Sequence, residues 1–477
     1  MTVDRRTLIA LTGALLAGAA GCTSDDRGTP EVGDETAGND GEFEQLESSD
    51  FPRLEPVTDP DIDLDLFAEQ VRGNVAFSFD VLSQLRNDRP EENVFFSPYS
   101  ISVALAMTYA GARGETATEM ADALQYELEN DLHTVFGALE DEFERRNEDG
   151  EALRAPDGER TKSASDGEEV ENPQDEGDED DLGFQLSSAN AVWTDDGFLL
   201  ADDYRDVLEA YYGAGDHVVD FTDSPEEARQ EINEWVEERT NDRIENLLPQ
   251  GSIDASTRLV LTNAVYFLAA WENDFTHDET EPAPFVGLDG TETEVELMHQ
   301  TAQFQYAEVD GHQLVELPYA NGETSMIVVL PAEGEFESFE ESFTVDRLAT
   351  MLEETSQTQV DLALPKFGIE SEFSLVEAMQ ELGMERAFGG GAEFDDMVEG
   401  GGNGLFIDDI RHKSFVEVDE EGTEAAAATA VTVFFSAPPD DAEMTVDRPF
   451  LFYVRDRPTE TPLFVGRVVD AETLQDD

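Results

Sequence analysis

The sequence has little of what most enzyme sites are built from. It contains one cysteine, Cys22, which cannot form a disulfide within the chain or build a metal site alone. The six histidines show no metal-ligand spacing, and no Gly-x-Ser-x-Gly nucleophile motif or phosphate-binding loop occurs. The acidic pairs Asp395-Asp396 and Asp408-Asp409 are typical of a solvated face on so acidic a chain. We therefore expect no catalytic residues, no cofactor and no bound metal.

Positive charge is also scarce. The 27 basic side chains, of which only three are lysines, face 112 acidic ones, and the formal net charge is −85. Such a charge repels phosphate, which excludes DNA and RNA as partners. An acidic, lysine-poor composition resembles that of proteins from concentrated salt, and we expect a halophilic protein.

The first testable expectation follows from this charge. Molar salt shortens the range of charge–charge repulsion to about 3 Å, so the self-repulsion of the chain is screened there. We expect the melting temperature to rise between dilute buffer and molar KCl or NaCl. A melting temperature that does not change would contradict this expectation.

The N-terminus has the pattern of an export signal. Arg5-Arg6 precedes an apolar stretch that ends at Ala20, which is shorter than the roughly 20 residues of a membrane span. The two arginines resemble a twin-arginine signal, and Ala20-Gly21-Cys22 resembles a lipobox, although Ala19 replaces the usual leucine. We expect residues 1–22 to form an export signal with a lipobox-like end and Cys22 to be lipidated as the first mature residue. We expect the protein to be exported, extracellular or anchored to the outer face of the cell membrane. The alternative is a plain secretory signal with an incidental cysteine.

Composition divides the rest of the chain. Residues 23–63 are rich in acidic and small polar side chains, which predicts a disordered tether. A folded domain is expected over 64–472, followed by a short tail at 473–477. Within that domain, residues 147–181 end in a run of acidic side chains that cannot pack, so we interpret them as a disordered insertion in a surface loop.

The folded region mixes helix and strand signals without regular alternation, which predicts an α+β fold. Ser97-Pro98 is typical of a helix start, because serine caps the first turn and proline fits there. Helical spacing occurs near Phe77, near Trp235 and over Thr240–Leu247. Apolar, β-branched runs predict strands at Leu259–Phe267, Ser325–Leu330, Val360–Leu364, Phe415–Val418 and Leu463–Val469.

Several stretches, taken in order, resemble the serpin family of serine protease inhibitors. They cover most of the chain from residue 64 to residue 470: Asn93–Ile101, Gly111–Ala117, Ile232–Val236, Leu261–Phe267 with Trp271, Leu364–Phe367, Asp419–Ala428, Arg448–Phe452 and Pro462–Gly466. The resemblance implies a large central mixed sheet with two smaller sheets, about eight to nine helices and an exposed reactive loop. It also implies a suicide substrate: the cleaved loop inserts into the central sheet and traps the protease as an acyl-enzyme. We expect a monomer.

The loop hinge fits this implied mechanism physically. Glycine allows the backbone to swing, and small side chains pass between strands without steric cost. A hydroxyl can be buried with a hydrogen-bond partner, whereas a charge cannot be buried cheaply. The expected hinge residues are Gly422, Thr423, Glu424, Ala425, Ala426, Ala427 and Ala428. This composition favours inhibition over the alternative, a non-inhibitory serpin that acts as a binding or structural module.

Counting from the hinge places the scissile bond at Ser436–Ala437, and a shift by one residue would make Phe435 the scissile residue. Phe435 suits a chymotrypsin-like or subtilisin-like pocket, and Ser436 suits an elastase-like one. No basic residue lies at the loop, which disfavours a trypsin-like target. We expect a subtilisin-like or chymotrypsin-like serine endopeptidase as the partner.

The family resemblance also implies a cluster that controls sheet opening. It consists of Ser97, Ser100, Asn190 and His412 beneath the central strands, with Trp271 near the end where the loop first inserts. We expect a buried His412 to hydrogen-bond Asn190 and a serine hydroxyl. A satisfied core histidine and a packed core tryptophan are the alternatives.

Overall fold

A computed structural model describes residues 64–128, 131–152, 184–213, 217–401, 404–423 and 441–472, all within one compact unit. The export signal with Cys22, the tether, most of the acidic insertion, the loop after Thr423 and the tail lie outside the described residues.

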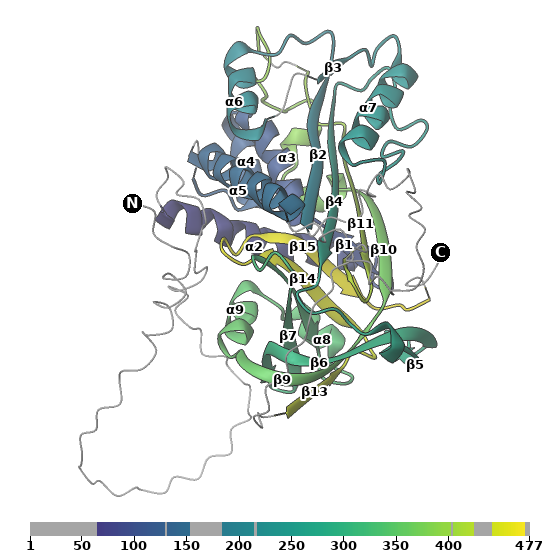
Figure 1. The fold of residues 1–477 in the computed structure, drawn as a ribbon. Coiled ribbons are helices and arrows are strands. Elements are labelled where there is room, and N and C mark those ends of the chain that lie inside the picture. Colours follow the sequence, from purple (N-terminus) through teal and green to yellow (C-terminus); the bar gives the residue numbers. More distant parts are fainter. Residues whose placement is uncertain are drawn as a thin grey trace, which may run out of the picture. The chain divides into compact units, whose positions relative to one another are not determined.

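A six-stranded mixed sheet forms the centre of the fold (Figure 1). β11 runs parallel to β4, and β3 runs parallel to β2, while the other pairings are antiparallel. The strand order is β10 (Phe367–Ser374), β11 (Asp409–Val418), β12 (Gly422–Thr423), β4 (Leu259–Ala270), β2 (Phe184–Asp195) and β3 (His217–Val219).

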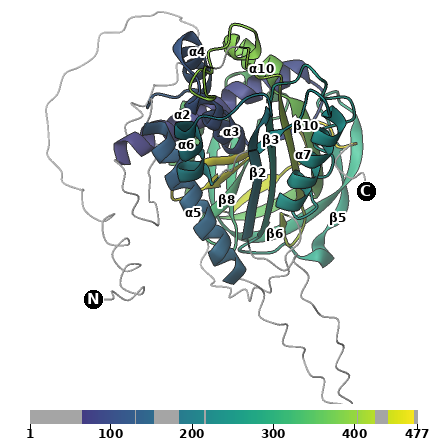
Figure 2. The same cartoon turned by 90° about the horizontal axis from the view of Figure 1, so that it is seen from above.

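Both faces of this sheet are covered, and every residue of β4 is buried. Alternate residues of β2 and β4 pack into separate cores, because successive side chains of a strand point to opposite faces. α3 (Pro98–Ala110) and α5 (Leu132–Ala152) lie on one side of β2 and α7 (Pro225–Arg239) lies on the other (Figure 2). This burial explains why the β4 sequence is a continuous apolar run rather than an alternating one.

The second sheet has nine strands: eight follow one another in a single path, and the ninth, β5, branches from β6 (Glu292–Val309). The first half of β6 pairs with β5 (Glu281–Val286), and its last residues pair with β7 (His312–Pro318). The remaining strands are β1 (Val94–Phe96), β15 (Pro462–Val468), β14 (Phe450–Asp456), β8 (Thr324–Leu330), β9 (Ser356–Pro365) and β13 (Asp441–Thr445). Four of the five strand runs expected from the sequence lie wholly in strands, the fifth extends one residue beyond β15 at Val469, and the α+β fold is confirmed.

Nine α-helices occur in the described residues, and none is long and apolar enough to cross a membrane. The predicted start of α3 is confirmed: the Ser97 hydroxyl accepts the Ser100 N–H at 3.2 Å, and Pro98 opens the helix. The other helices are α2 (Leu64–Asp88), α4 (Gly114–Leu124), α6 (Asp202–Tyr212), α8 (Phe336–Glu341), α9 (Val345–Glu353) and α10 (Val376–Glu381).

Two local expectations were wrong. α7 ends at Arg239, and Thr240–Leu247 forms turns in which Asn241, Asp242 and Asn246 have positive φ. The apolar residues of this segment are spaced to pack on β4, and that spacing imitates a helix. The expected insertion start at Asn147 falls inside α5, which continues to Ala152. Asn147 is held on β2, because its side-chain amide pairs with the Leu186 backbone at 2.8 and 2.9 Å.

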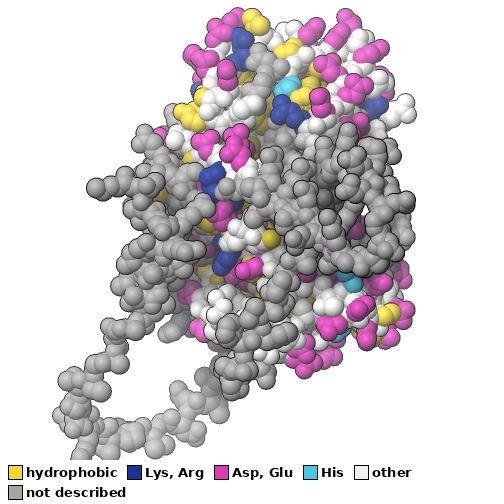
Figure 3. All heavy atoms as spheres, in the orientation of Figure 1, with side chains coloured by type: hydrophobic (Ala, Val, Ile, Leu, Met, Phe, Trp, Pro, Cys, Tyr) yellow, Lys and Arg dark blue, Asp and Glu magenta, His cyan; other side chains and the backbone are white. Residues whose placement is uncertain are grey.

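Acidic side chains dominate the part of the described surface that Figure 3 shows. Arginine and lysine are scattered among them as single residues or small groups. The described side chains in this view form no broad basic patch.

Candidate functional site: a sheet that forks at the loop hinge

The central sheet forks where the hinge begins. β11 and β4 pair directly from Asp409 with Val260 to Phe415 with Tyr266. Beyond that point the two strands separate, and β12 lies between them: Thr423 pairs with Val418 on one side and with Ala269 on the other. The first two hinge residues therefore already form a short strand of the sheet. Ahead of them β11 and β4 pair directly, and we call this line of pairing the seam.

The two inserted residues fit this place closely. Thr423 is fully buried, and its hydroxyl is 2.8 Å from the Tyr319 hydroxyl, so the polar group is paired as the sequence predicted. A Cβ on Gly422 would lie 2.3 Å from the Ala269 carbonyl oxygen. Glycine is thus required here by the close approach of β4, which adds a steric reason to the expected flexibility.

Trp271 holds the segment that leads into the hinge. Its indole N–H donates to the Asp419 carbonyl at 3.1 Å, and its backbone N–H donates to the Glu421 carbonyl at 3.0 Å. The ring stacks on Tyr319 with centroids 4.6 Å apart and an interplanar angle of 6°. These contacts place Trp271 beside the turn that leads into β12. Trp271 follows β4 directly and lies eight residues along the chain from Asn263, so it does not join the polar cluster described below.

A buried ion pair sits beside the hinge, and sequence reasoning missed it. Glu420 is 3% exposed, and its carboxylate lies 2.8 Å from the ammonium of Lys366 and 2.7 Å from the Thr280 hydroxyl. Burial acts to raise the pKa of Glu420, but the bonds from Lys366 and Thr280 outweigh it and hold this pKa at about 2. A signal was present in the sequence, because Lys366 is one of three lysines in the whole chain.

His412 and Asn263 link the two strands ahead of the hinge. They are paired positions of β11 and β4, and His412 Nδ1 hydrogen-bonds to the Asn263 side-chain oxygen. The Ser97 backbone N–H donates to His412 Nε2 at 3.2 Å, which leaves the ring proton on Nδ1. The expected partners were different: the structure gives His412 the amide of Asn263 in place of Asn190, and a backbone N–H in place of a serine hydroxyl.

Ser100 and Asn190 complete this cluster, which we call the seam cluster: Ser97, Ser100, Asn190, Asn263 and His412. The Ser100 hydroxyl donates to the Asn190 side-chain oxygen at 2.8 Å. The Asn263 amide donates to Ser100 at 2.8 Å and to Asn190 at 2.6 Å. The four expected members therefore lie together, and Asn263 is the central residue that sequence reasoning missed. An asparagine in the middle of a largely apolar strand was the signal for it.

The buried histidine predicts a pH dependence of stability. Burial lowers the pKa of His412 to about 3, below its ordinary 6.5. The unfolded chain therefore binds the extra proton first, and stability is lost as the pH falls from 6.5 toward 3, by about 1.4 kcal/mol per pH unit. We expect His412→Gln to remove this part of the pH dependence in thermal melts between pH 6.5 and pH 4.

The matched control is His133→Gln. Burial lowers the pKa of His133 to about 4 as well, but His133 lies on α5, far from the seam in sequence and outside the seam cluster. Each variant should reduce the slope of stability against pH by the contribution of its own histidine. An unchanged slope in His412→Gln would show that His412 is already protonated in the folded protein.

The remaining expected site residues lie outside the described residues: the lipidation candidate Cys22, the hinge residues Glu424, Ala425, Ala426, Ala427 and Ala428, and the scissile candidates Phe435, Ser436 and Ala437. Of the acidic pairs set aside as metal ligands, Asp396 pairs with Arg113, and Asp408 accepts the backbone N–H groups of Arg258 and Leu259.

In the described residues, the fold is a mixed α+β arrangement in which the residues after β11 add a short strand to the central sheet. The comparisons with known proteins agree. The model of the family described as "Serpin (serine protease inhibitor)" matches residues 72–471. The chain belongs to the serpin family.

Relatives in other organisms cover nearly the same region. An uncharacterized serpin-like protein of Thermococcus kodakarensis is 38% identical over 399 residues, which are 83% of this chain and 84% of the relative. Leukocyte elastase inhibitor A of Mus musculus is 34% identical over 406 residues, 83% of this chain and 97% of the relative. The crystal structure of tengpin, a thermophilic serpin in its native state, has a TM-score of 0.70 and 27% identity, and the match covers 88% of this chain and 97% of tengpin.

Proposed function

We propose that the protein inhibits serine endopeptidases as a suicide substrate. The target serine attacks the loop at Phe435 or Ser436, the peptide bond breaks, and the loop before it stays esterified to the protease. Insertion of that loop between β11 and β4 then pulls the protease against the inhibitor, and its distorted oxyanion hole no longer supports hydrolysis. The observation that carries the proposal is the fork, where Gly422 and Thr423 already occupy the start of the insertion path.

The pairing register supports insertion over the full seam. If β12 extends without a shift, Thr429 comes opposite both Asn263 and His412, and Val433 comes opposite Leu259, the first residue of β4. The ten residues after Thr423 thus match the length of the seam, and the candidate scissile residues Phe435 and Ser436 follow after one further residue. The register comes from the strand pairing alone, so its match to the length of the seam is independent of the amino-acid composition of the hinge.

The same register fits the chemistry of the seam. Thr423 faces the buried side, so Ala425, Ala427 and Thr429 would face that side as well. Insertion must break the hydrogen bond between His412 and Asn263, and the Thr429 hydroxyl would arrive beside both partners. We expect Thr429→Val to slow complex formation several-fold, because the two buried polar groups would then lose their replacement partner. Thr432→Val, the same change on the opposite face of the extended strand, is the matched control.

The loop composition supports a target with an apolar or small specificity pocket. Phe435 would fit a chymotrypsin-like or subtilisin-like protease, and Ser436 an elastase-like one. The relative that is named a leukocyte elastase inhibitor supports the second class. We favour a subtilisin-like or chymotrypsin-like target, because two phenylalanines precede Ser436 in the loop.

We also propose that the protein is exported and held at the outer face of the cell membrane by a lipid on Cys22. The pair Arg5-Arg6 and the small residues before Cys22 support this location. Labelling of expressing cells with a radioactive or clickable fatty acid tests it, with Cys22→Ser as the control. Label in Cys22→Ser, or none in the natural sequence, would contradict the anchor.

The test of inhibition is direct. The full chain is mixed with subtilisin in molar salt and the products are separated in SDS. We expect a complex that resists SDS, and mass spectrometry of the released C-terminal peptide should begin at Ser436 or Ala437. Cleavage of the loop without any complex would instead support the non-inhibitory alternative.

A further inference from the structure

A group of titratable side chains lies against the turn that leads from β11 into β12. Residues 419–421 form this turn, and the backbone N–H groups of Trp271 and Phe275 donate to two of its carbonyls at 3.0 and 2.8 Å. The Asp419 carboxylate closes the turn by accepting two backbone N–H groups, one of them from Gly422 at 3.1 Å. A change of charge at this turn therefore acts directly on the first hinge residue.

Asp274 lies between the two backbone contacts and is half-buried. One of its carboxylate oxygens is buried and makes no hydrogen bond among the described residues. Burial, and then the negative charges of Glu421 and Asp419, raise the pKa of Asp274 to about 6, and His277 opposes them. The ionised form of Asp274 is thus poorly solvated and repelled by the turn, whereas the neutral form is not.

His277 meets the same turn from η3 (His277–Glu279). Its Nε2 is 3.3 Å from a carboxylate oxygen of Glu421, and its Nδ1 is 3.4 Å from a carboxylate oxygen of Glu420. The bond to Glu421 and the charge of Glu420 raise the pKa of His277 above its ordinary 6.5, although burial and Lys366 oppose them. A protonated His277 therefore bridges two successive residues of the turn.

The other charged groups at the turn are Glu420, Lys366 and Asp419. Glu420 is ionised above its pKa of about 2. Burial lowers the pKa of Lys366, but Glu420, Asp419 and Glu296 of β6 outweigh it and raise this pKa. Burial raises the pKa of Asp419, and its bonds from backbone N–H groups and the charge of Lys366 oppose this. The proton of His277 thus always meets an ionised Glu420.

We propose that Asp274, His277 and the turn 419–421 form a proton-operated hinge latch, which closes as the two side chains take up protons and then holds Gly422 and Thr423 in β12. A proton on Asp274 removes the repulsion between residues 271–275 and the turn. A proton on His277 adds an attraction to the same turn. Both protons act in one direction, so acidification tightens the latch.

The latch determines whether β12 is in place before the loop is cut. Thr423 pairs with Val418 and Ala269, and these are the only ladder contacts of β12 apart from that of Gly422 with Ala270. A cleaved loop that starts from a formed β12 extends an existing strand, whereas a frayed hinge must first be ordered. This consequence rests on the proposed function, because trapping requires insertion to outpace hydrolysis of the acyl-enzyme.

Thermal melts of the full chain in molar KCl test the latch without a protease. The folded pKa of Asp274 is about 6 and its ordinary value is 3.8, so its ionisation lowers stability as the pH rises from 3.8 to 6 and by a constant amount above that. Asp274→Asn should therefore raise the melting temperature by about 2 °C or more at pH 6 and pH 8.5, and much less at pH 4.

His277→Gln should act in the opposite direction and in a different range of pH. The folded pKa of His277 is raised, so its contribution is fully present below pH 6.5 and is lost as the pH rises through the folded pKa. The variant should melt below the natural sequence at pH 4 and pH 6, by less than the Asp274→Asn gain because the side chain is 64% exposed, and equally at pH 8.5.

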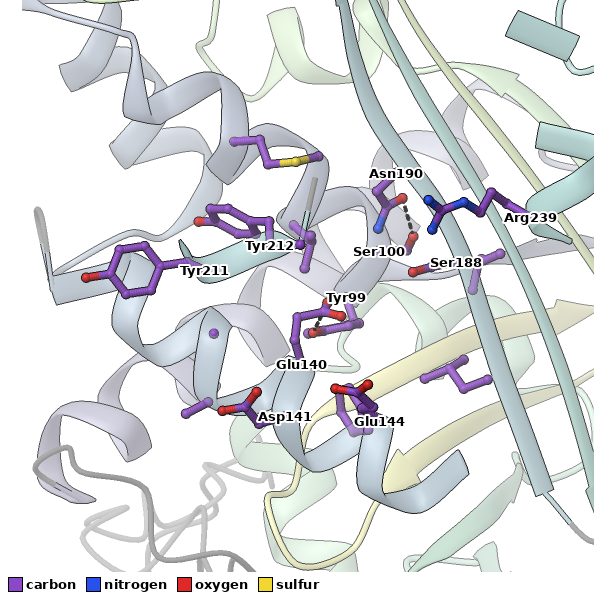
Figure 4. A pocket seen from close by; sticks show the side chains of 18 of the residues that line it. Tyr99, Ser100, Glu140, Asp141, Glu144, Ser188, Asn190, Tyr211, Tyr212 and Arg239 are labelled. Carbon is purple, nitrogen blue, oxygen red and sulfur yellow. Dashed lines mark hydrogen bonds between the residues drawn. The ribbon is translucent and has the colours of Figure 1, made fainter. Parts of the chain in front are cut away.

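Asp278→Asn is the matched control, because it removes an exposed acid of η3 next to His277. Each variant is compared with the natural sequence at the same pH, so the titrations of His133, His412 and Glu140, which lines the cavity in Figure 4, cancel. An Asp274→Asn effect that is the same at pH 4 and pH 8.5, or that Asp278→Asn reproduces, would refute the latch.

The effect on trapping is measured separately with subtilisin at fixed pH, as the ratio of cleaved inhibitor to SDS-resistant complex. At pH 8.5 this ratio should be at least twofold lower in Asp274→Asn than in the natural sequence. At pH 6 it should be higher in His277→Gln. Ratios equal to that of the natural sequence in both variants would refute the effect on trapping. If no complex forms at any pH, inhibition is refuted, while the melts still decide the latch.

Discussion

Thr423→Arg is expected to convert the inhibitor into a substrate. Thr423 is fully buried between β11 and β4, with its hydroxyl 2.8 Å from Tyr319, so an arginine there would bury a charge without a partner. Insertion would then be slower than hydrolysis of the acyl-enzyme, and the protease would be released. We expect the number of inhibitor molecules consumed per protease to rise at least tenfold, with nearly all of the loop cleaved and little complex in SDS.

Thr423→Ser is the matched control, because it keeps the hydroxyl and reduces only the packing. It should retain most of the inhibition. If Thr423→Arg inhibits as well as the natural sequence, the hinge does not insert where β12 lies, and the account of insertion is wrong.

Glu420→Lys is expected to destabilise the hinge end of the sheet. The substitution replaces the ion pair with two ammonium groups in a site where Glu420 is 3% exposed. Breaking a fully buried pair costs about 3–5 kcal/mol, and we expect about 2–4 kcal/mol here because the Lys366 side chain is 31% exposed. The variant should melt several degrees below the natural sequence in molar salt.

Glu420→Gln separates charge from shape, since glutamine can still accept from Thr280. Because the pKa of Glu420 is held at about 2, below its ordinary 4.5, the ion pair contributes fully above pH 4.5 and is lost as the pH falls toward 2. The difference in melting temperature between Glu420→Gln and the natural sequence should therefore shrink below pH 4.5. A difference that is the same at pH 3 and pH 7 would show that the pair contributes nothing to stability.

Much of the fold was predictable because local signals and tertiary packing agree. Ser97-Pro98 begins α3 as capping rules predict, and the apolar run around Asn263 forms the most buried strand of the central sheet. The wrong expectation at Thr240–Leu247 arose where the two disagree. There, apolar residues are spaced to pack on β4, while residues with positive φ end the helix.

The site was predictable only in part, because hydrogen-bond partners depend on register between distant strands. His412, Ser100 and Asn190 were expected to cluster, but the partner of His412 is set by the parallel pairing of β11 with β4, which brings Asn263 opposite it. The pair of Glu420 and Lys366 joins residues 54 positions apart, one in the turn after β11 and the other directly before the neighbouring strand β10. Composition shows that Lys366 is one of few lysines, but it does not predict which carboxylate forms an ion pair with it.

Insertion of the loop into the seam is the central claim, and the melting temperature of the nicked protein tests it most directly. Thermolysin forms no acyl-enzyme, so it can cut the loop near Phe434 without being trapped, and mass spectrometry locates the cut. Ten further residues would then pair on both sides, and the nicked chain should melt higher than the intact chain by roughly 10 °C or more. Nicked Thr423→Arg should gain far less. A nicked chain of the natural sequence that melts at or below the intact temperature would contradict the account.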